Sequence, residues 1–174
     1  ILMNQLGMPA EMRQAPALAQ ADIERGVVHK ISKIWEFHFV FSNILPIEIF
    51  LELKKGLREE FSKTGNKAIF EIKALSQEFS NQLLQSYYRE AFSEGPCASQ
   101  GFKSLYQNLQ VRAEGNQLLI EGSEAIDKEH FKKNHLPNLA KQLEKFGFPT
   151  FNCQVEKNDV LTQEQEEAFH AENE

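Results

Sequence analysis

One stretch, residues 33–53, limits most strongly what this chain can fold into. Trp35, Phe37, Phe39 and Phe41 alternate there with Ile, Glu, His and Val residues. Alternate side chains of an extended strand lie on the same face, so this period of two predicts a strand with one aromatic face. Four rings are a large apolar surface to leave in water, and we expect that face to be buried.

A helix is predicted directly after this strand. Pro46 suits the first turn of a helix, where its missing N–H is not needed. Apolar residues at helical spacing follow it: Ile47, Phe50, Leu53, Leu57 and Phe61. Gly65 and Asn66 form a stop signal, so the helix should end near Lys63. The aromatic strand therefore leads into an amphipathic helix that can lie back on it.

Two further strands complete a first module, residues 21–76. Apolar residues between Ala21 and Ile31 suggest a strand, in which Gly26 marks a bulge. A tight turn near Ser32 would pair this strand antiparallel with the aromatic one. Residues 67–75 are rich in β-forming residues and predict another strand. The order of the module is then β-β-α-β.

A second module is predicted in residues 77–156, with the order α-α-β-β-α-β. Its first helix carries a wide apolar stripe, and Ser99 can cap a second, short helix. Gly115 lies in a turn between two short strands, and Pro137 splits the last helical region. The expected elements are a helix from about Phe79 to Phe92, a helix after Ser99, strands 110–114 and 117–121, a split helix 123–147 and a strand 150–156.

The two modules share a sequence signature. Asn43-Ile44-Leu45-Pro46 precedes the main helix of the first module, and Asn134-His135-Leu136-Pro137 precedes that of the second. Each motif is followed by an amphipathic helix and a terminal strand, which favours two related β-β-α-β modules. Such modules need only a small sheet with helices on one face, and the predicted fold class is α+β.

Charge divides the chain unevenly. The net charge is −6, and residues 157–174 hold one lysine against six acids. We interpret this segment as an acidic tail or linker and residues 1–20 as a lead-in; Ile1 suggests a fragment or a trimmed start. The negative net charge of the whole chain argues against strong nonspecific DNA binding. We also expect no membrane association, because no apolar run approaches the ~18 residues of a spanning helix. Cys97 and Cys153 are expected to be two reduced thiols in a cytoplasmic protein.

Several segments resemble the N-terminal region of the PolC-type replicative DNA polymerase III α subunit of Gram-positive bacteria. The match covers nearly the whole chain. Its segments are Val28-His29-Lys30, Trp35-Glu36-Phe37-His38-Phe39, Asn43-Ile44-Leu45-Pro46, Leu84-Gln85-Ser86-Tyr87-Tyr88-Arg89-Glu90-Ala91-Phe92, Phe131-Lys132-Lys133-Asn134-His135-Leu136-Pro137-Asn138-Leu139 and Gln142-Leu143-Glu144-Lys145-Phe146-Gly147-Phe148.

The resemblance implies a noncatalytic accessory region of a replicase. In that family, two small domains of this kind precede the polymerase, and the exonuclease and polymerase carboxylates lie downstream. The second domain looks like the polymerase-binding end of the clamp-loader τ subunit, a variant of the KH fold. The implied partner is a replisome protein, such as a τ-type clamp-loader subunit, with no cofactor and no small-molecule substrate.

The residues themselves also indicate no catalysis. The chain has no phosphate-binding glycine loop and no recognisable nucleophile motif. His29 and His38 lie on neighbouring predicted strands and could meet, but no Cys or Asp cluster accompanies them as metal ligands. His130 and His135 are five residues apart, which predicts different helix faces. We therefore expect neither a metal nor a cofactor.

Two binding functions remain open. A single-stranded or primed DNA site would use the lysines and arginine of the two main helices, although the GxxG loop of KH modules is absent. A protein-docking site would use aromatic anchors from the wide stripe of the first helix of the second module. The candidate DNA contacts are Lys54, Lys55, Arg58, Lys132, Lys133 and Lys141, and the candidate anchors are Tyr87, Tyr88 and Phe92.

Overall fold

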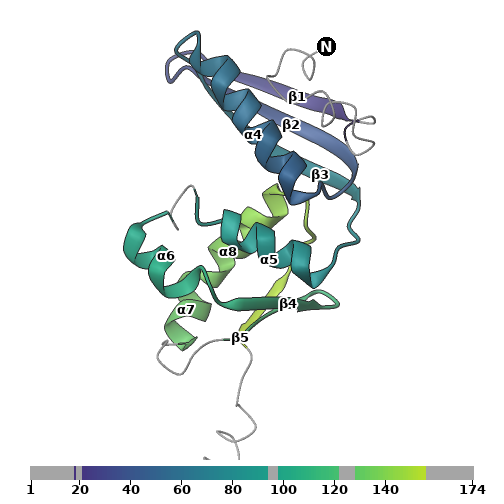
Figure 1. Ribbon diagram of the computed structural model, residues 1–174, viewed down its shortest axis with the longest axis vertical. Coiled ribbons are helices and arrows are strands. Elements are labelled where there is room, and N and C mark those ends of the chain that lie inside the picture. The colour runs from purple at the N-terminus through teal and green to yellow at the C-terminus, as the bar shows by residue number, and fades with distance from the viewer. Residues whose placement is uncertain (1–17, 19–20, 94–97, 122–127, 156–174) are drawn as a thin grey trace, which may run out of the picture.

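The computed structural model describes residue 18 and residues 21–93, 98–121 and 128–155 (Figure 1). The acidic tail and all of the lead-in except Leu18 lie outside the described residues, as does Cys97. Figure 1 shows the chain as two units, one in purple and blue above a second in teal to yellow-green. Within the described parts of the chain, no helix is both long enough and apolar enough to cross a bilayer.

The first unit is a three-stranded sheet with one helix on it. Its elements are β1 (Asp22–His29), β2 (Ile34–Asn43), α4 (Ile47–Ser62) and β3 (Lys67–Ser76). The strand order is β1-β2-β3, with β1 antiparallel and β3 parallel to β2. The turn predicted near Ser32 is present, and Lys33 lies there in the left-handed region with φ 55°.

Three of the four predicted aromatic side chains of β2 are buried. Phe39 is 1% exposed and Phe41 is fully covered, whereas Trp35 keeps 36% of its surface in solvent. Trp35 contacts Phe61, which lies in the last turn of α4, at a ring distance of 5.4 Å. The prediction that the whole face is buried was therefore wrong for Trp35, because the helix ends over the first ring.

The predicted bulge at Gly26 was also wrong. Gly26 stays in register opposite Phe37, and the register shifts between Ile23 and Arg25 instead. A bulge of the commonest kind places its extra residue near the right-handed helical region, which any residue can adopt. No glycine is therefore required, and the sequence has no marker for the shift.

The second unit is a helical layer on a second three-stranded sheet. The strand order is β4-β5-β6, with β4 antiparallel and β6 parallel to β5. Ser99 caps α6 as predicted, because its hydroxyl accepts a hydrogen bond from the Phe102 N–H. The elements are α5 (Asn81–Glu90), α6 (Gln100–Tyr106), β4 (Gln110–Glu114), β5 (Gln117–Glu121), α7 (Lys128–Asn134), α8 (Leu136–Lys145) and β6 (Asn152–Val155).

The two units repeat one topology. In each, an antiparallel hairpin is followed by a helical connection to a third strand that lies parallel to the second. Pro46 directly precedes α4, and Pro137 lies in the first turn of α8. After these helices the chain reverses at Gly65 and Gly147, both with positive φ. The predicted α+β class, with two β-β-α-β modules and two helices before the second, is confirmed.

An aromatic cluster joins the units. Phe50 of α4 contacts Tyr87 of α5 at 5.1 Å and Phe146 at the end of α8 at 5.0 Å between ring centres. The Tyr87 hydroxyl donates a hydrogen bond of 2.7 Å to the carbonyl oxygen of Leu45. The buried side chains of both units consequently belong to one continuous hydrophobic core.

Candidate protein-docking surfaces

The predicted aromatic anchors are not on the surface. Tyr87, Tyr88 and Phe92 are all fully buried. The Tyr87 hydroxyl bonds to Leu45, and the Tyr88 hydroxyl donates to the carbonyl oxygen of Tyr106 at 2.7 Å. The stripe of α5 is wide because the helix packs on both units at once, so these residues are corrected from binding anchors to core.

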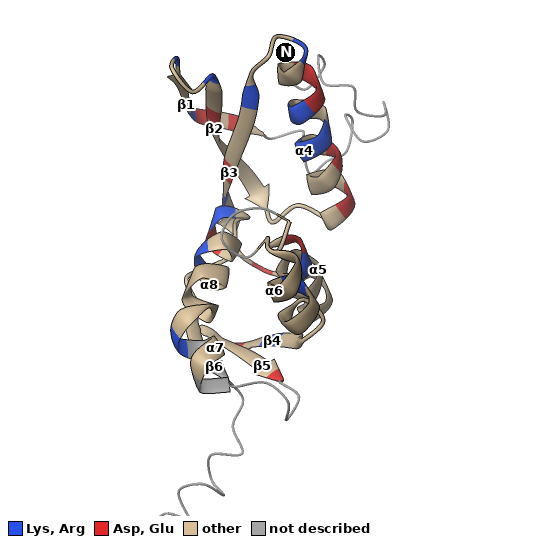
Figure 2. Cartoon of the chain, turned by 90° about the vertical axis from the view of Figure 1, so that its left-hand side faces the viewer, with Lys and Arg blue, Asp and Glu red and all other residues tan. Residues whose placement is uncertain are grey.

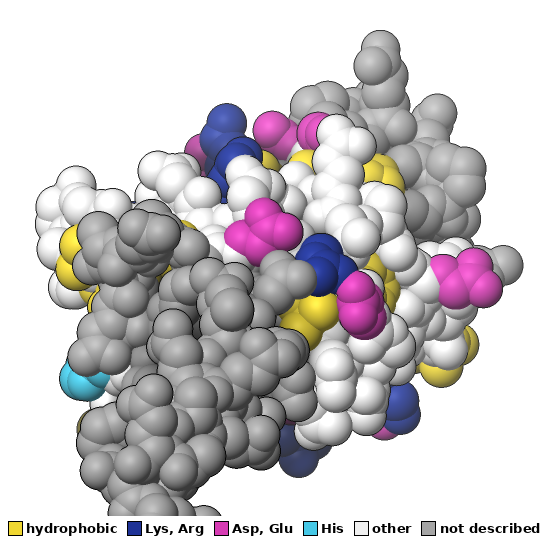
Figure 3. All heavy atoms as spheres, turned by 90° about the horizontal axis from the view of Figure 1, so that it is seen from below, with side chains coloured by type: hydrophobic (Ala, Val, Ile, Leu, Met, Phe, Trp, Pro, Cys, Tyr) yellow, Lys and Arg dark blue, Asp and Glu magenta, His cyan; other side chains and the backbone are white. Residues whose placement is uncertain are grey.

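The predicted basic residues do not form one surface. Lys54 is largely buried and pairs with Glu90 at 2.7 Å, whereas Lys55 and Arg58 are exposed. Lys133 and Lys141 are exposed on α7 and α8 of the other unit, and the side chain of Lys132 lies outside what the structure describes. Figure 2 shows Lys and Arg interleaved with Asp and Glu along α4. Seen from below in Figure 3, charges of both signs are again scattered among uncharged groups.

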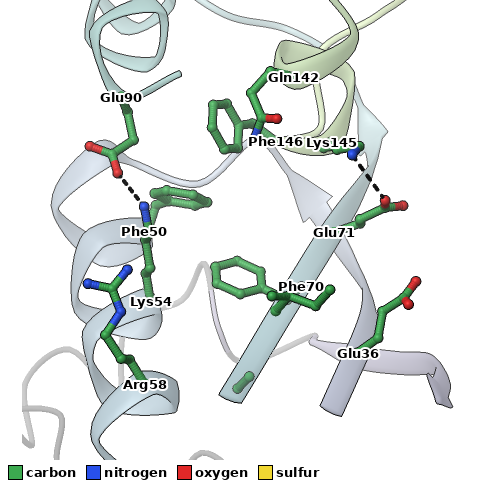
Figure 4. Close-up of a pocket in the computed structure, with 12 residues that line it drawn as sticks. Glu36, Phe50, Lys54, Arg58, Phe70, Glu71, Glu90, Gln142, Lys145 and Phe146 are labelled. Carbon is green, nitrogen blue, oxygen red and sulfur yellow. Dashed lines mark hydrogen bonds and ion pairs between the residues drawn. The ribbon is translucent and has the colours of Figure 1, made fainter. Parts of the chain in front are cut away.

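A cavity lies where the two units meet. Its volume is about 210 Å³, and it lies beside β3 between α4, α5 and α8 (Figure 4). Phe50, Phe70 and Phe146 supply apolar lining, while Arg58 and Lys54 approach from α4. The residues that line this cavity come from distant parts of the chain, so the periodicity of the sequence did not predict it.

Two ion pairs bridge the units at this cavity. Lys54 Nζ lies 2.7 Å from Glu90 Oε1, and both side chains are largely buried. Lys145 Nζ lies 3.9 Å from Glu71 Oε1, with both side chains about half exposed. The dashed lines of Figure 4 mark these two contacts. Acids and bases are thus matched here, and the cavity carries no excess of positive charge for a phosphate.

The tip of the β1–β2 hairpin exposes apolar side chains. Ile31 in the turn is fully exposed, and Val28 and Trp35 are partly exposed on the paired strands behind it. We call these three residues the hairpin patch. The sequence analysis missed this patch because it assigned Ile31 to the first strand, whereas the structure places Ile31 in the turn.

His29 and His38 both contact Glu36, on the face of the first sheet opposite its buried aromatic face. Glu36 accepts hydrogen bonds from His29 Nε2 at 3.1 Å and from His38 Nε2 at 2.7 Å. These bonds favour the charged carboxylate and lower the pKa of Glu36 below its usual value. Arg25 and Glu71 also contact His38. Among the described residues no group of three or more His, Cys, Asp or Glu is arranged to hold a metal ion.

His130 and His135 do lie together, contrary to the prediction. Their ring centres are 5.2 Å apart, because the chain turns between the end of α7 and the start of α8. Burial, and secondarily the neighbouring His130, lower the pKa of His135. His135 also packs on Phe102 at 4.6 Å, which indicates a packing role. Cys153 is a free thiol whose pKa is raised, mainly by burial.

Comparison with known proteins identifies both units. The model of the family described as DNA polymerase III polC-type N-terminus I matches residues 1–72, and that of DNA polymerase III polC-type N-terminus II matches residues 86–174. The chain is 96% identical, over 99% of its length, to DNA polymerase III PolC-type of Streptococcus pneumoniae strain D39. It is 62% identical to that of Streptococcus sanguinis and 44% identical to that of Streptococcus suis. The chain spans 12% of the length of these relatives. No solved structure matches.

Proposed function

Because this chain belongs to the PolC-type DNA polymerase III family, as its N-terminus I and II regions, we propose that it is a noncatalytic docking region used in DNA replication. It holds another replisome protein, of which a τ-type clamp-loader subunit is the first candidate. The polymerase and 3′–5′ exonuclease activities of the parent protein reside elsewhere in the longer chain. The region acts in the cytoplasm and needs no cofactor or small-molecule substrate.

The hairpin patch is the observation that carries this proposal. Trp35 offers a large ring that is partly exposed yet fixed by Phe61 and Phe37. Aromatic anchors held in place in this way dominate many protein interfaces, because little side-chain entropy is lost when they bind. Ile31 and Val28 extend the apolar area around it.

The proposed docking region has two parts, which correspond to the two repeated units. We propose that residues 21–76 form one docking module and residues 77–156 the other, with residues 1–20 as a lead-in and 157–174 as an acidic linker. The joint aromatic core holds the modules in one arrangement, so that a partner meets both as a single surface. The ion pairs between Lys54 and Glu90 and between Lys145 and Glu71 support that arrangement.

One observation favours a second candidate function, auxiliary binding of single-stranded or primed DNA. Lys30 and Lys33 flank Ile31 at the hairpin tip, and Lys67 lies beside Lys33, whose carbonyl oxygen accepts its backbone N–H. A partly exposed Trp35 near three lysines resembles the stacking platform of single-strand binders. The α4 and α8 lysines support this alternative less well, because acids surround them.

Titration with a labelled single-stranded oligonucleotide separates the two functions. At roughly 150 mM salt, near physiological ionic strength, protein docking predicts weak DNA binding with little dependence on salt. Micromolar or tighter binding that falls steeply with salt, and that Lys30→Glu with Lys33→Glu weakens, would replace docking by DNA handling. In a plot of the logarithm of the binding constant against the logarithm of the salt concentration, each phosphate contact that the variant loses would then make the slope shallower by about 0.7.

A further inference from the structure

The hairpin patch lies at an end of the first unit where lysines gather. The turn of residues 30–33 joins β1 to β2, and residues 63–67 lead from α4 into β3. The Lys67 N–H donates to the carbonyl oxygen of Lys33 at 2.9 Å, so these two segments are in direct contact. Together they hold four lysines and no acid: Lys30, Lys33, Lys63 and Lys67. Figure 2 shows blue residues at the β1–β2 turn and at the start of β3, at the end of the first unit that lies away from the second.

Most of this positive charge is not neutralised by the chain itself. Among the residues that the structure describes, only Lys63 of these four lysines has an ion pair, with Glu60 at 2.7 Å. Lys30, Lys33 and Lys67 are exposed and have none. Glu36, the first acid of β2, already accepts hydrogen bonds from two histidines. This end of the molecule therefore carries an excess of positive charge.

An apolar centre lies among these lysines. Lys30 and Lys33 flank Ile31, whose side chain is fully exposed. Val28 and Trp35 face each other across the hairpin behind it, and the Trp35 ring packs on Phe61 of α4. Protein interfaces commonly combine an apolar centre with a polar rim. At the hairpin patch that rim is basic, which selects a partner surface of the opposite charge.

We propose that the hairpin patch and its lysines bind an acidic segment of the partner protein, in which aspartates or glutamates flank one or two large apolar side chains. The apolar side chains pack on the hairpin patch, and the carboxylates face Lys30, Lys33 and Lys67. Opposite charges speed association and set the orientation, whereas the apolar contact slows dissociation. This inference rests on the proposed function, because it specifies the chemistry of the segment that docks at that same patch.

Two other occupants fit this site less well. Single-strand binders stack successive bases on several aromatic rings, whereas Trp35 is the one exposed ring of β2 and its other three aromatic residues are buried. The exposed Ile31 and Val28 offer no ring to a base, but they suit an apolar side chain. Residues 157–174 of the chain are also acidic, but they follow β6 of the second unit, away from this end of the first. We therefore assign the segment to another protein.

Fluorescence of Trp35, the single tryptophan, reports binding at the patch itself in the complete 174-residue chain. The probe is a short synthetic peptide of aspartate, glutamate, leucine and phenylalanine. It should shift the Trp35 emission to shorter wavelength in a saturable manner, and added salt should weaken its binding. Binding should be at least about tenfold weaker for a peptide with lysine in place of the acids and for one with serine in place of the apolar residues. A single-stranded oligonucleotide of the same net charge should also bind more weakly.

A matched pair of double variants tests the lysines. Lys30→Glu with Lys33→Glu should weaken binding of the acidic peptide by about tenfold or more, because like charges then meet. Lys133→Glu with Lys141→Glu changes the net charge equally at exposed residues of the second unit, and it should change the affinity much less. Ile31→Ser should weaken binding without altering its salt dependence. Far-ultraviolet circular dichroism checks that all these variants fold like the wild type.

No binding of the acidic peptide, equal binding of the lysine peptide, or equal effects of the two double variants would overturn this inference. A tail that occupied the site within the same molecule would give the first of these results. Tighter binding of the oligonucleotide than of the acidic peptide would overturn both this inference and docking.

Failure of this inference can be told apart from failure of the proposed function. If the acidic peptide does not bind but a τ-type subunit does, in a manner that depends on Ile31, docking stands and the acidic segment is wrong. If the peptide binds as predicted and the subunit does not, the acidic segment stands and belongs to a different partner protein.

Discussion

The Tyr87 hydroxyl donates a hydrogen bond of 2.7 Å to the carbonyl oxygen of Leu45, and this bond links α5 of the second unit to the residue before Pro46 and α4 of the first. Both residues are fully buried. The surrounding burial also raises the pKa of Tyr87, so that the hydroxyl stays protonated and can donate. The hydroxyl is therefore protonated at neutral pH and available to donate this bond.

Tyr87→Phe should destabilise both units together. The change leaves a buried carbonyl without its donor, which costs about 1–3 kcal/mol of unfolding free energy. Trp35 is the single tryptophan and reports on the first unit, whereas far-ultraviolet circular dichroism reports on both. In urea, the two signals should change together and at a lower midpoint than in the wild type. A variant in which only circular dichroism shifted would show that the units unfold independently.

Phe39→Ala and Trp35→Ala should differ in stability. Phe39 is buried in the middle of the aromatic face, and its truncation should cost about 3–5 kcal/mol. Trp35 keeps part of its surface in solvent, so its truncation should cost clearly less. Urea unfolding followed by circular dichroism measures both. Equal losses would mean that Trp35 is as deeply packed as Phe39 in solution.

Gly147→Ala should destabilise the contact between α8 and β3. The residue has φ 107°, and an added methyl group would press on Ala74 and Ile72. Such backbone strain costs on the order of 1–3 kcal/mol. Gly101→Ala is the matched control, because Gly101 lies in α6 with open space around its Cβ position. It should stabilise the protein by roughly 0.5–1 kcal/mol through helix propensity. Equal thermal midpoints for the two variants would contradict this account of the contact.

The hydrogen bonds of Glu36 with His29 and His38 should contribute stability that is lost in acid. The pKa of Glu36 is lowered in the folded protein, so its stabilising effect is full above the ordinary value of 4.5 and is lost as the pH falls through the folded value. Glu36→Gln should therefore lose stability at neutral pH and show a shallower fall of the urea midpoint in acid. Glu59→Gln, an exposed acid on α4, is the control. Parallel pH curves for Glu36→Gln and the wild type would show that the histidine bonds contribute nothing.

Much of the fold was readable because local pattern and tertiary structure agree. Period two in β2, helical spacing in α4 and the turn at Gly115 each predicted an element that the structure contains. The predicted boundaries of β4 and β5 coincide with the observed ones. These features depend on contacts with near neighbours in the sequence, which a pattern can reveal.

The candidate functional surfaces could not be predicted from sequence patterns in the same way. Tyr87 and Tyr88 looked like spare aromatics because a helix pattern shows the width of a stripe but not how many partners pack on it. The cavity beside β3 depends on where α8 lies, and that is fixed by contacts between residues far apart in the chain, such as Gly147 and Ala74. His130 and His135 meet only because a helix ends between them.

Binding of the chain to a τ-type clamp-loader subunit, measured by surface plasmon resonance with Ile31→Asp and Leu105→Asp, tests the docking account most directly. Both residues are exposed and apolar, but Ile31 belongs to the hairpin patch and Leu105 lies on α6. The account predicts that Ile31→Asp weakens binding by about 1–4 kcal/mol, mainly through faster dissociation, whereas Leu105→Asp binds like the wild type. Absence of wild-type binding, or equal affinities for all three proteins, would contradict it.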